Sequence, residues 1–122
     1  MLLVRAYVAA SPIQGVGLFA AEAIPKGTLM WRFDPVVDII VPLDKVAKLP
    51  PPMREFFDRY GYISPYFQGG YVIGLDNCRF INHSETPNTD NNSEFAHALR
   101  DIAEGEEITA NYREFATNHE FA

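Results

Sequence analysis

The chain has 122 residues, 48% of them hydrophobic and 13% aromatic, which indicates one globular domain over residues 1–122. Its net charge of −6 excludes a generic nucleic-acid binder, which needs a basic face, and favours a basic partner such as a lysine-rich peptide. A simpler explanation is that most soluble proteins carry a net negative charge only because it keeps them in solution. No apolar run approaches the roughly 18 residues that cross a bilayer, so no membrane contact is expected.

The cysteine content and the first residues indicate a cellular location. One cysteine, Cys78, excludes an internal disulfide and a multi-cysteine zinc site. Arg5 interrupts the first apolar run too early for the core of a secretory signal. We therefore expect an intracellular, reducing compartment. Since no basic cluster suggests nuclear import, the cytoplasm is favoured, with the nucleus as the alternative for a eukaryotic chain.

The first third of the chain predicts short strands separated by turns. Residues 2–10 are rich in Val, Ala and Tyr and predict a strand. Residues 15–17, Gly-Val-Gly, predict a tight bend before the apolar run 18–20. Two further strands are expected over residues 28–33 and 36–41.

The middle of the chain predicts its helices. Asp44 is expected to cap a short helical turn that ends at Leu49. Residues 53–60 have apolar side chains at helical spacing, and Gly61 follows as an end signal. This stripe predicts a face that packs on the core, and not a cofactor site. Its members are Met53, Phe56, Phe57 and Tyr60.

The remaining elements are predicted strands. Residues 68–70, Gln-Gly-Gly, predict a hairpin turn before a strand over residues 71–75. Strands are also expected over residues 95–99 and 107–112. Many short strands, tight turns and little helix predict a mostly β domain with interrupted sheets.

The segment from Arg79 to Asn88 is the most informative one in the chain. It reads Arg-Phe-Ile-Asn-His-Ser-Glu-Thr-Pro-Asn and gathers polar side chains behind a short apolar patch. Such a loop can hold a ligand, but Asn and Ser also build turns by bonding nearby backbone. The side chains available for a third interpretation, a metal site, are Asp76, Cys78, His83 and His97. Their spacings fit no usual zinc pattern, so no metal is expected.

Two weaker segments accompany it. The glycines of residues 15–17 let the backbone pass close to a ligand, although a plain turn needs the same glycines. The third glycine of a dinucleotide motif is missing. Residues 105–112, Gly-Glu-Glu-Ile-Thr-Ala-Asn-Tyr, end in Tyr112. An isolated tyrosine there is usually a packing residue, and it matters chemically only when its hydroxyl points into a cavity.

In this order along one chain, the three segments resemble the SET domain family, whose members are mainly protein-lysine methyltransferases. The resemblance covers about residues 11–112 and is to a compact, free-standing type without a cysteine-rich segment after the domain. It implies a mostly β SET fold with several small curved sheets, short helices and a C-terminal pseudoknot. There, residues 79–84 are threaded beside residues 107–112, which is an exception to the usual absence of knots.

The resemblance implies transfer of a methyl group from S-adenosyl-L-methionine to the side-chain amine of a protein lysine. Tyr112 matches the catalytic tyrosine and is expected to orient the amine, since the pKa of about 10 of a free tyrosine makes it a weak base. The residues implied to contact the cofactor are Gln14, Gly15, Val16, Gly17, Tyr62, Arg79, Asn82 and His83. Tyr62 is the first candidate for an aromatic beside the adenine, and Tyr66 is the second.

The expected substrate channel includes Phe33, Ala110 and Phe115. Phe33 stands where relatives frequently have a tyrosine, so one hydroxyl near the amine would be absent. Ala110 stands where relatives often have Phe or Tyr, and the extra room predicts tolerance of di- or trimethylation. The rest of the channel is expected from the tail, through Phe115 and Phe121, or from the second subunit of a homodimer.

Two alternatives to an active methyltransferase remain. A non-catalytic SET-fold binding module would recruit a basic protein partner with weak or no turnover, and both Phe33 and the missing cysteine-rich segment favour this hypothesis. A metal hydrolase built on His83 and His97 would require a bound metal ion. Binding of S-adenosylmethionine distinguishes the methyltransferase from a purely structural module.

Overall fold

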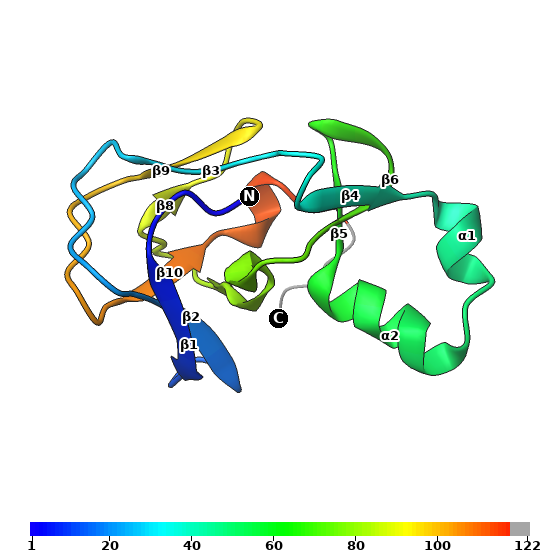
Figure 1. Ribbon diagram of the computed structural model, residues 1–122, viewed down its shortest axis with the longest axis horizontal. Coiled ribbons are helices and arrows are strands. Elements are labelled where there is room, and N and C mark those ends of the chain that lie inside the picture. Colours follow the sequence, from blue (N-terminus) through cyan, green and yellow to red (C-terminus); the bar gives the residue numbers. More distant parts are fainter. Residues whose placement is uncertain (118–122) are drawn as a thin grey trace.

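A computed structural model describes residues 1–117, which form three small sheets with few helices (Figure 1). The first sheet has the order β1 (Ala6–Ala10), β2 (Val16–Ala20), β10 (Glu107–Ala110) and β7 (Asn82–His83). The second has the order β3 (Leu29–Arg32), β9 (Phe95–Ala98) and β8 (Thr89–Asp90). The third has the order β4 (Asp38–Val41), β6 (Phe67–Gly74) and β5 (Tyr62–Ser64).

The helical elements are α1 (Leu43–Ala47), α2 (Pro51–Tyr60) and the 3-10 turns η1 (Asn77–Phe80) and η2 (Tyr112–Glu114). In Figure 1, α1 and α2 lie with the third sheet at one end of the molecule, and the other two sheets lie at the opposite end. The expectation of a mostly β domain with several small sheets and short helices is confirmed. Within the described residues, neither α-helix has the length and apolar character needed to span a bilayer.

Several predicted strands are present but shorter. The strand predicted over residues 2–10 is regular only in β1, and Leu2 makes a single bridge to Trp31. In the predicted bend at residues 15–17, Gly15 alone has a positive φ, of 48°, and β2 already begins at Val16. The prediction that Tyr112 ends a strand is wrong, because β10 stops at Ala110 and the chain turns into η2.

The predicted hairpin turn at residues 68–70 is wrong, because β6 runs through both glycines there. Gly69 and Gly70 have φ values of 114° and 140°, which other residues rarely adopt. A Cβ on Gly70 would stand 2.0 Å from the carbonyl oxygen of Val41 on the neighbouring strand β4. These glycines therefore allow close pairing of two strands, and the chain reverses earlier, between β5 and β6.

Helix α2 begins two residues earlier than predicted, because the preceding Pro50 occupies its N-cap position and Pro51 fits the first turn. The prediction that Gly61 ends the helix is confirmed. The apolar stripe packs on the core only in part: Phe57 is buried with Val46 and Ile73, whereas Met53 is 43% exposed. In α1, the N-cap is Pro42 and Asp44 lies in the first turn, so the predicted cap is wrong.

Strand β10 lies at the centre of the main core. It pairs antiparallel with β2 and parallel with β7, and Ile108 and Leu18 are fully buried at the first of these contacts. The backbone N–H of Ser84 also donates to the carbonyl of Ala110, at 3.0 Å. The expected adjacency of residues 79–84 and 107–112 is therefore confirmed.

A buried amide holds this adjacency. The Asn88 side chain is 1% exposed and donates to the Glu107 carbonyl at 2.8 Å. Its oxygen accepts from the Thr109 N–H at 2.9 Å, and the Thr89 hydroxyl donates to the Thr109 carbonyl at 2.7 Å. A buried polar side chain is tolerated when its bonds are made, so Asn88 fixes β10 against the loop that surrounds it.

Candidate active site

Two hollows meet in the middle of the molecule. An apolar cavity lies among the three sheets, and a polar groove lies between α2 and the bend at Gln14 to Val16. The residues that line both are Arg59, Tyr60, Arg79, Ile81 and Tyr112. This shared wall brings together α2, the segment from Arg79 and the segment that ends in Tyr112. Both hollows therefore reach Tyr112.

The Tyr112 hydroxyl is fixed at this junction. It donates a short hydrogen bond to the backbone carbonyl of Ile81. Because its proton is committed to that carbonyl, the hydroxyl can act toward a further group only as an acceptor. Burial and the nearby Cys78 raise the pKa of Tyr112 to about 12, although the charge of Arg59 acts in the opposite direction. The neutral hydroxyl is therefore an orienting group at neutral pH.

His83 holds the backbone that carries this tyrosine. Its Nδ1 accepts a hydrogen bond of 3.0 Å from the N–H of Tyr112, and the two rings meet edge to face at 5.3 Å. The Nε2 lies 3.3 Å from the Glu85 carboxylate, which also pairs with Arg113. Accepting at Nδ1 leaves Nε2 as the donor to Glu85. The contacts with Tyr112 place His83 at the start of η2.

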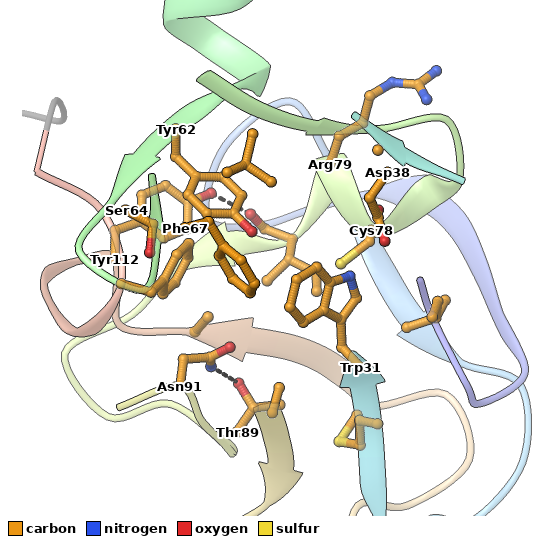
Figure 2. Close-up of a pocket in the computed structure, with 18 of the residues that line it drawn as sticks. Trp31, Asp38, Tyr62, Ser64, Phe67, Cys78, Arg79, Thr89, Asn91 and Tyr112 are labelled. Atoms are coloured by element: carbon orange, nitrogen blue, oxygen red, sulfur yellow. Dashed lines mark hydrogen bonds between the residues drawn. The ribbon is translucent and has the colours of Figure 1, made fainter. Parts of the chain in front are cut away.

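The apolar cavity has aromatic walls. Figure 2 shows Tyr62, Phe67 and Tyr112 on one side of it, with Trp31 and Cys78 across from them. The centroid of the Phe115 ring lies 5.1 Å from that of Tyr62 and 5.6 Å from that of Tyr112, and both pairs meet edge to face. The structure thus places Tyr62 in the cavity with Phe115, and Tyr62 does not line the polar groove.

Polar side chains line another part of the cavity wall. Ser64 contributes from β5, and Asn91 donates to the Thr89 hydroxyl at 2.8 Å (Figure 2). Only some of the residues expected in the substrate channel line this cavity. Ala110 and Phe115 line the cavity, whereas Phe33 does not and instead stacks on Phe67 at 5.2 Å. Phe121 lies outside the described residues.

The buried tyrosines predict a loss of stability in alkali. Burial, followed by the charges of Cys78, Asp38 and Asp76, raises the pKa of Tyr62, and the pKa of Tyr112 is raised to about 12. A tyrosine in the unfolded chain has a pKa of about 10. Between pH ~10 and ~12 the folded state therefore holds more protons than the unfolded state, and stability falls as pH rises.

Urea unfolding at pH 8, 10 and 11 would measure this effect. The free energy of unfolding should begin to decline above pH ~9, because burial also raises the pKa of the Cys78 thiol to about 12, and should decline more steeply above pH ~10, where unfolded tyrosines ionise. Tyr112→Phe should show a shallower decline over the same range. Equal declines in the two proteins would contradict the assignment to Tyr112.

The polar groove is organised around Asn82. Its amide nitrogen donates to the carbonyls of Gln14, at 3.3 Å, and Val16, at 3.0 Å, and to Glu107, at 3.0 Å. The Glu107 carboxylate also accepts from the Ser11 hydroxyl at 2.8 Å. These bonds connect the bend at residues 14–16 to β7 and β10. The loop conformation on this side of the groove is thus fixed before any ligand binds.

Gly17 is required by the same arrangement. A Cβ at this position would stand 2.3 Å from a carboxylate oxygen of Glu107 and 3.0 Å from the Asn82 amide. Any side chain would displace the carboxylate that holds Asn82. Glycine is needed at the two positions for different reasons. Gly15 adopts a positive φ, whereas Gly17 lets the side chains of Glu107 and Asn82 approach the backbone closely.

Of the site residues expected from the sequence, those that line the polar groove are Gln14, Val16, Arg79, Asn82 and Tyr112. It missed the contribution of α2, whose groove-lining residues are Glu55, Asp58, Arg59 and Tyr60. The helical stripe identified a core face, but no local signal showed that the last turn reaches the groove. Within residues 1–117, no group of three or more His, Cys, Asp or Glu side chains is placed to bind a metal.

Comparison with known proteins defines the class. Residues 15–113 match the family model of the SET domain. The chain therefore belongs to the SET domain family. A search of curated proteins found no match.

Solved structures share the fold. The chain is similar to a Plasmodium falciparum protein described as a histone methyltransferase, with 21% identity and a TM-score of 0.63 over 91% of this chain and 95% of that one. It is similar to Chaetomium thermophilum polycomb repressive complex 2 bound to S-adenosylmethionine, with 23% identity and a TM-score of 0.66 over 94% of this chain and 16% of that one. An active polycomb repressive complex 2 in the basal state gives 25% identity and a TM-score of 0.63 over 89% and 15%. The chain thus spans only a small part of the polycomb proteins.

Proposed function

We propose that this chain transfers a methyl group from S-adenosylmethionine to the side-chain amine of a lysine in a protein substrate. The observation that carries the proposal is the meeting of a polar groove and an apolar cavity at Tyr112. Methyl transfer needs a donor and an amine in line, entering from different sides. Two hollows that share one wall satisfy this requirement, and membership of the SET domain family supports the same chemistry.

The polar groove fits the cofactor. When bound, S-adenosylmethionine supplies a methyl group on a sulfonium centre, which is a good leaving group. Gln14 and Val16 present backbone beside the groove, and Asn82 and Arg79 line it. The positive φ of Gly15 shapes the bend at the edge of the groove. A structural neighbour binds the same cofactor, which supports this assignment.

The apolar cavity prepares the lysine. A free lysine has a pKa of about 10.4, so the neutral amine costs roughly 4–5 kcal/mol at pH 7. An apolar wall disfavours the ammonium form and lowers that cost. The lone pairs of the Tyr112 hydroxyl then accept an N–H of the amine and direct its own lone pair toward the groove. With the cofactor bound, the lysine ammonium would first release one proton to solvent, and the neutral amine would then take the methyl group as the carbon–sulfur bond breaks, which leaves a methylammonium and a thioether.

Tyr62 and Phe115 form part of the lysine channel in this proposal. Their contact at 5.1 Å and their common cavity support a role around the lysine side chain, and not beside the adenine as the sequence suggested for Tyr62. Phe33 stands behind Phe67, so its missing hydroxyl takes nothing from the cavity wall. Phe33 therefore gives less support to a non-catalytic binding module.

A basic protein is the proposed substrate. The net charge of −6 favours lysine-rich partners. The Plasmodium falciparum neighbour is described as a histone methyltransferase, which makes histones the first substrates to test.

The test combines binding with turnover. Titration calorimetry should detect binding of S-adenosylmethionine, and mass spectrometry should detect methyl-lysine on core histones or on a lysine-rich protein mixture. Binding without methyl transfer to any of these proteins would favour the binding module. Absence of cofactor binding would overturn the proposed function.

The small side chain of Ala110 predicts the degree of methylation. Ala110 lines the cavity and is 3% exposed, so it leaves room beside the amine for methyl groups. The wild-type product should include di- or trimethyl-lysine, and Ala110→Val should shift the product toward monomethyl-lysine. Mass spectrometry of the product, at matched turnover, measures the shift.

Ala98→Val is a matched control for this substitution. Ala98 is also 3% exposed, but it belongs to the main core and does not line the cavity. This variant should lose stability to a similar degree and keep the product distribution. Strict monomethylation by the wild-type protein would contradict the prediction.

A further inference from the structure

The last turn of α2 brings a cation to the polar groove. The guanidinium Nη2 of Arg59 lies 3.9 Å from the point where a Cβ on Gly15 would stand. Arg59 lines the groove together with Gln14 and Val16, and it lines the apolar cavity as well. Its position beside the glycine bend is set by the packing of α2, and not by the family motifs.

Arg59 and Arg79 differ in what they already bind. Arg79 donates to the carbonyls of Leu75, at 3.3 Å, and Asp76, at 3.1 Å, and lies over the ring of Phe80 at 4.7 Å. Arg59 is exposed and lies 5.5 Å from the ring centre of Tyr60. Within residues 1–117 no hydrogen bond or ion pair holds the Arg59 guanidinium. Its N–H donors are thus available to a ligand, whereas those of Arg79 are partly used.

A carboxylate is the group that such a cation fits. A guanidinium binds a carboxylate through two parallel hydrogen bonds and keeps its charge at every physiological pH. Acidic side chains of the same helix, Glu55 and Asp58, also line the groove. A groove with both signs of charge suits a zwitterionic α-amino acid end, with its carboxylate at the Arg59 guanidinium.

We propose that Arg59 binds the carboxylate of the methionyl end of the cofactor and makes the groove selective for a methyl donor that carries this group. The inference rests on the proposed function, since it names the contact that positions the same cofactor. Arg59 is a specificity-determining residue here. Tyr112 lines the same groove, so a carboxylate fixed at Arg59 would direct the methionyl chain of the cofactor toward Tyr112.

Calorimetry with two matched ligands tests the contact. S-Adenosylhomocysteine carries the carboxylate, and its decarboxylated analogue differs only by lacking it. Arg59→Gln should weaken binding of S-adenosylhomocysteine on the order of 10- to 100-fold, the range for a hydrogen bond between charged groups. Binding of the decarboxylated analogue should change by less than about 3-fold. Comparing the two ligands on the two proteins isolates the interaction between Arg59 and the carboxylate. Arg59→Lys should restore part of the affinity.

The helix offers a matched control. Arg54 is also exposed on α2 but lines neither hollow, so Arg54→Gln removes the same charge from the same helix and should leave both affinities unchanged. Equal weakening of both ligands by Arg59→Gln would show a structural role and overturn the inference. Unchanged binding of both would overturn it while leaving the proposed function intact. A wild-type protein that binds neither ligand would overturn the proposed function as well.

Discussion

Tyr112→Phe should lower the rate of methyl transfer by about 10²- to 10³-fold, the usual loss when one positioned polar group is removed from a reacting centre. The Tyr112 hydroxyl is fixed by its bond to the Ile81 carbonyl and lines both hollows, where its oxygen can act only as an acceptor. Without it, the lysine amine loses the acceptor that orients it. Single-turnover kinetics with a lysine-rich protein would measure the change.

Cofactor binding separates this effect from unfolding. The phenylalanine ring keeps the edge-to-face contacts with His83 and Phe115, so affinity for S-adenosylmethionine should change by less than about 3-fold. Tyr7→Phe is the control, because the Tyr7 ring is 43% exposed on β1 and lines neither hollow. A Tyr112→Phe rate equal to that of the wild type would contradict the catalytic assignment.

The sequence motifs predicted the part of the site that is built from contiguous segments. Asn82 and Arg79 lie within one short run, and their roles depend on local order along the chain. The meeting of this run with Tyr112 came from resemblance to a family, because the parallel pairing of β7 with β10 joins residues far apart. A two-residue strand such as β7 has no periodic signal of its own.

There is a physical reason why the sequence did not reveal that α2 lines the groove. Helical periodicity separates an apolar face from a polar one, and it predicted that Tyr60 packs on the core without indicating where Arg59 lies. Which polar residues face a groove depends on how the helix packs, through Phe57 on Ile73 and Val46. The same limit applies to Gly70, where the need for glycine comes from the carbonyl of Val41 on another strand.

Gly17→Ala should weaken binding of S-adenosylmethionine on the order of 10- to 100-fold and cost about 1–3 kcal/mol of stability. The new Cβ would stand 2.3 Å from a carboxylate oxygen of Glu107, which therefore has to move. That carboxylate holds the Asn82 amide at 3.0 Å and accepts from Ser11 at 2.8 Å. Its displacement releases the bonds that fix the bend beside the groove.

Gly27→Ala separates the loss of binding from the loss of stability. Gly27 has a φ of 85° but nothing within 4 Å of its Cβ position, so the substitution costs about 1–2 kcal/mol of backbone strain far from the groove. Calorimetry should show unchanged cofactor affinity for Gly27→Ala and a large loss for Gly17→Ala at a temperature where both remain folded. If Gly17→Ala binds the cofactor as the wild type does, the Glu107–Asn82 contact does not shape the groove, and the cofactor must depend on other residues.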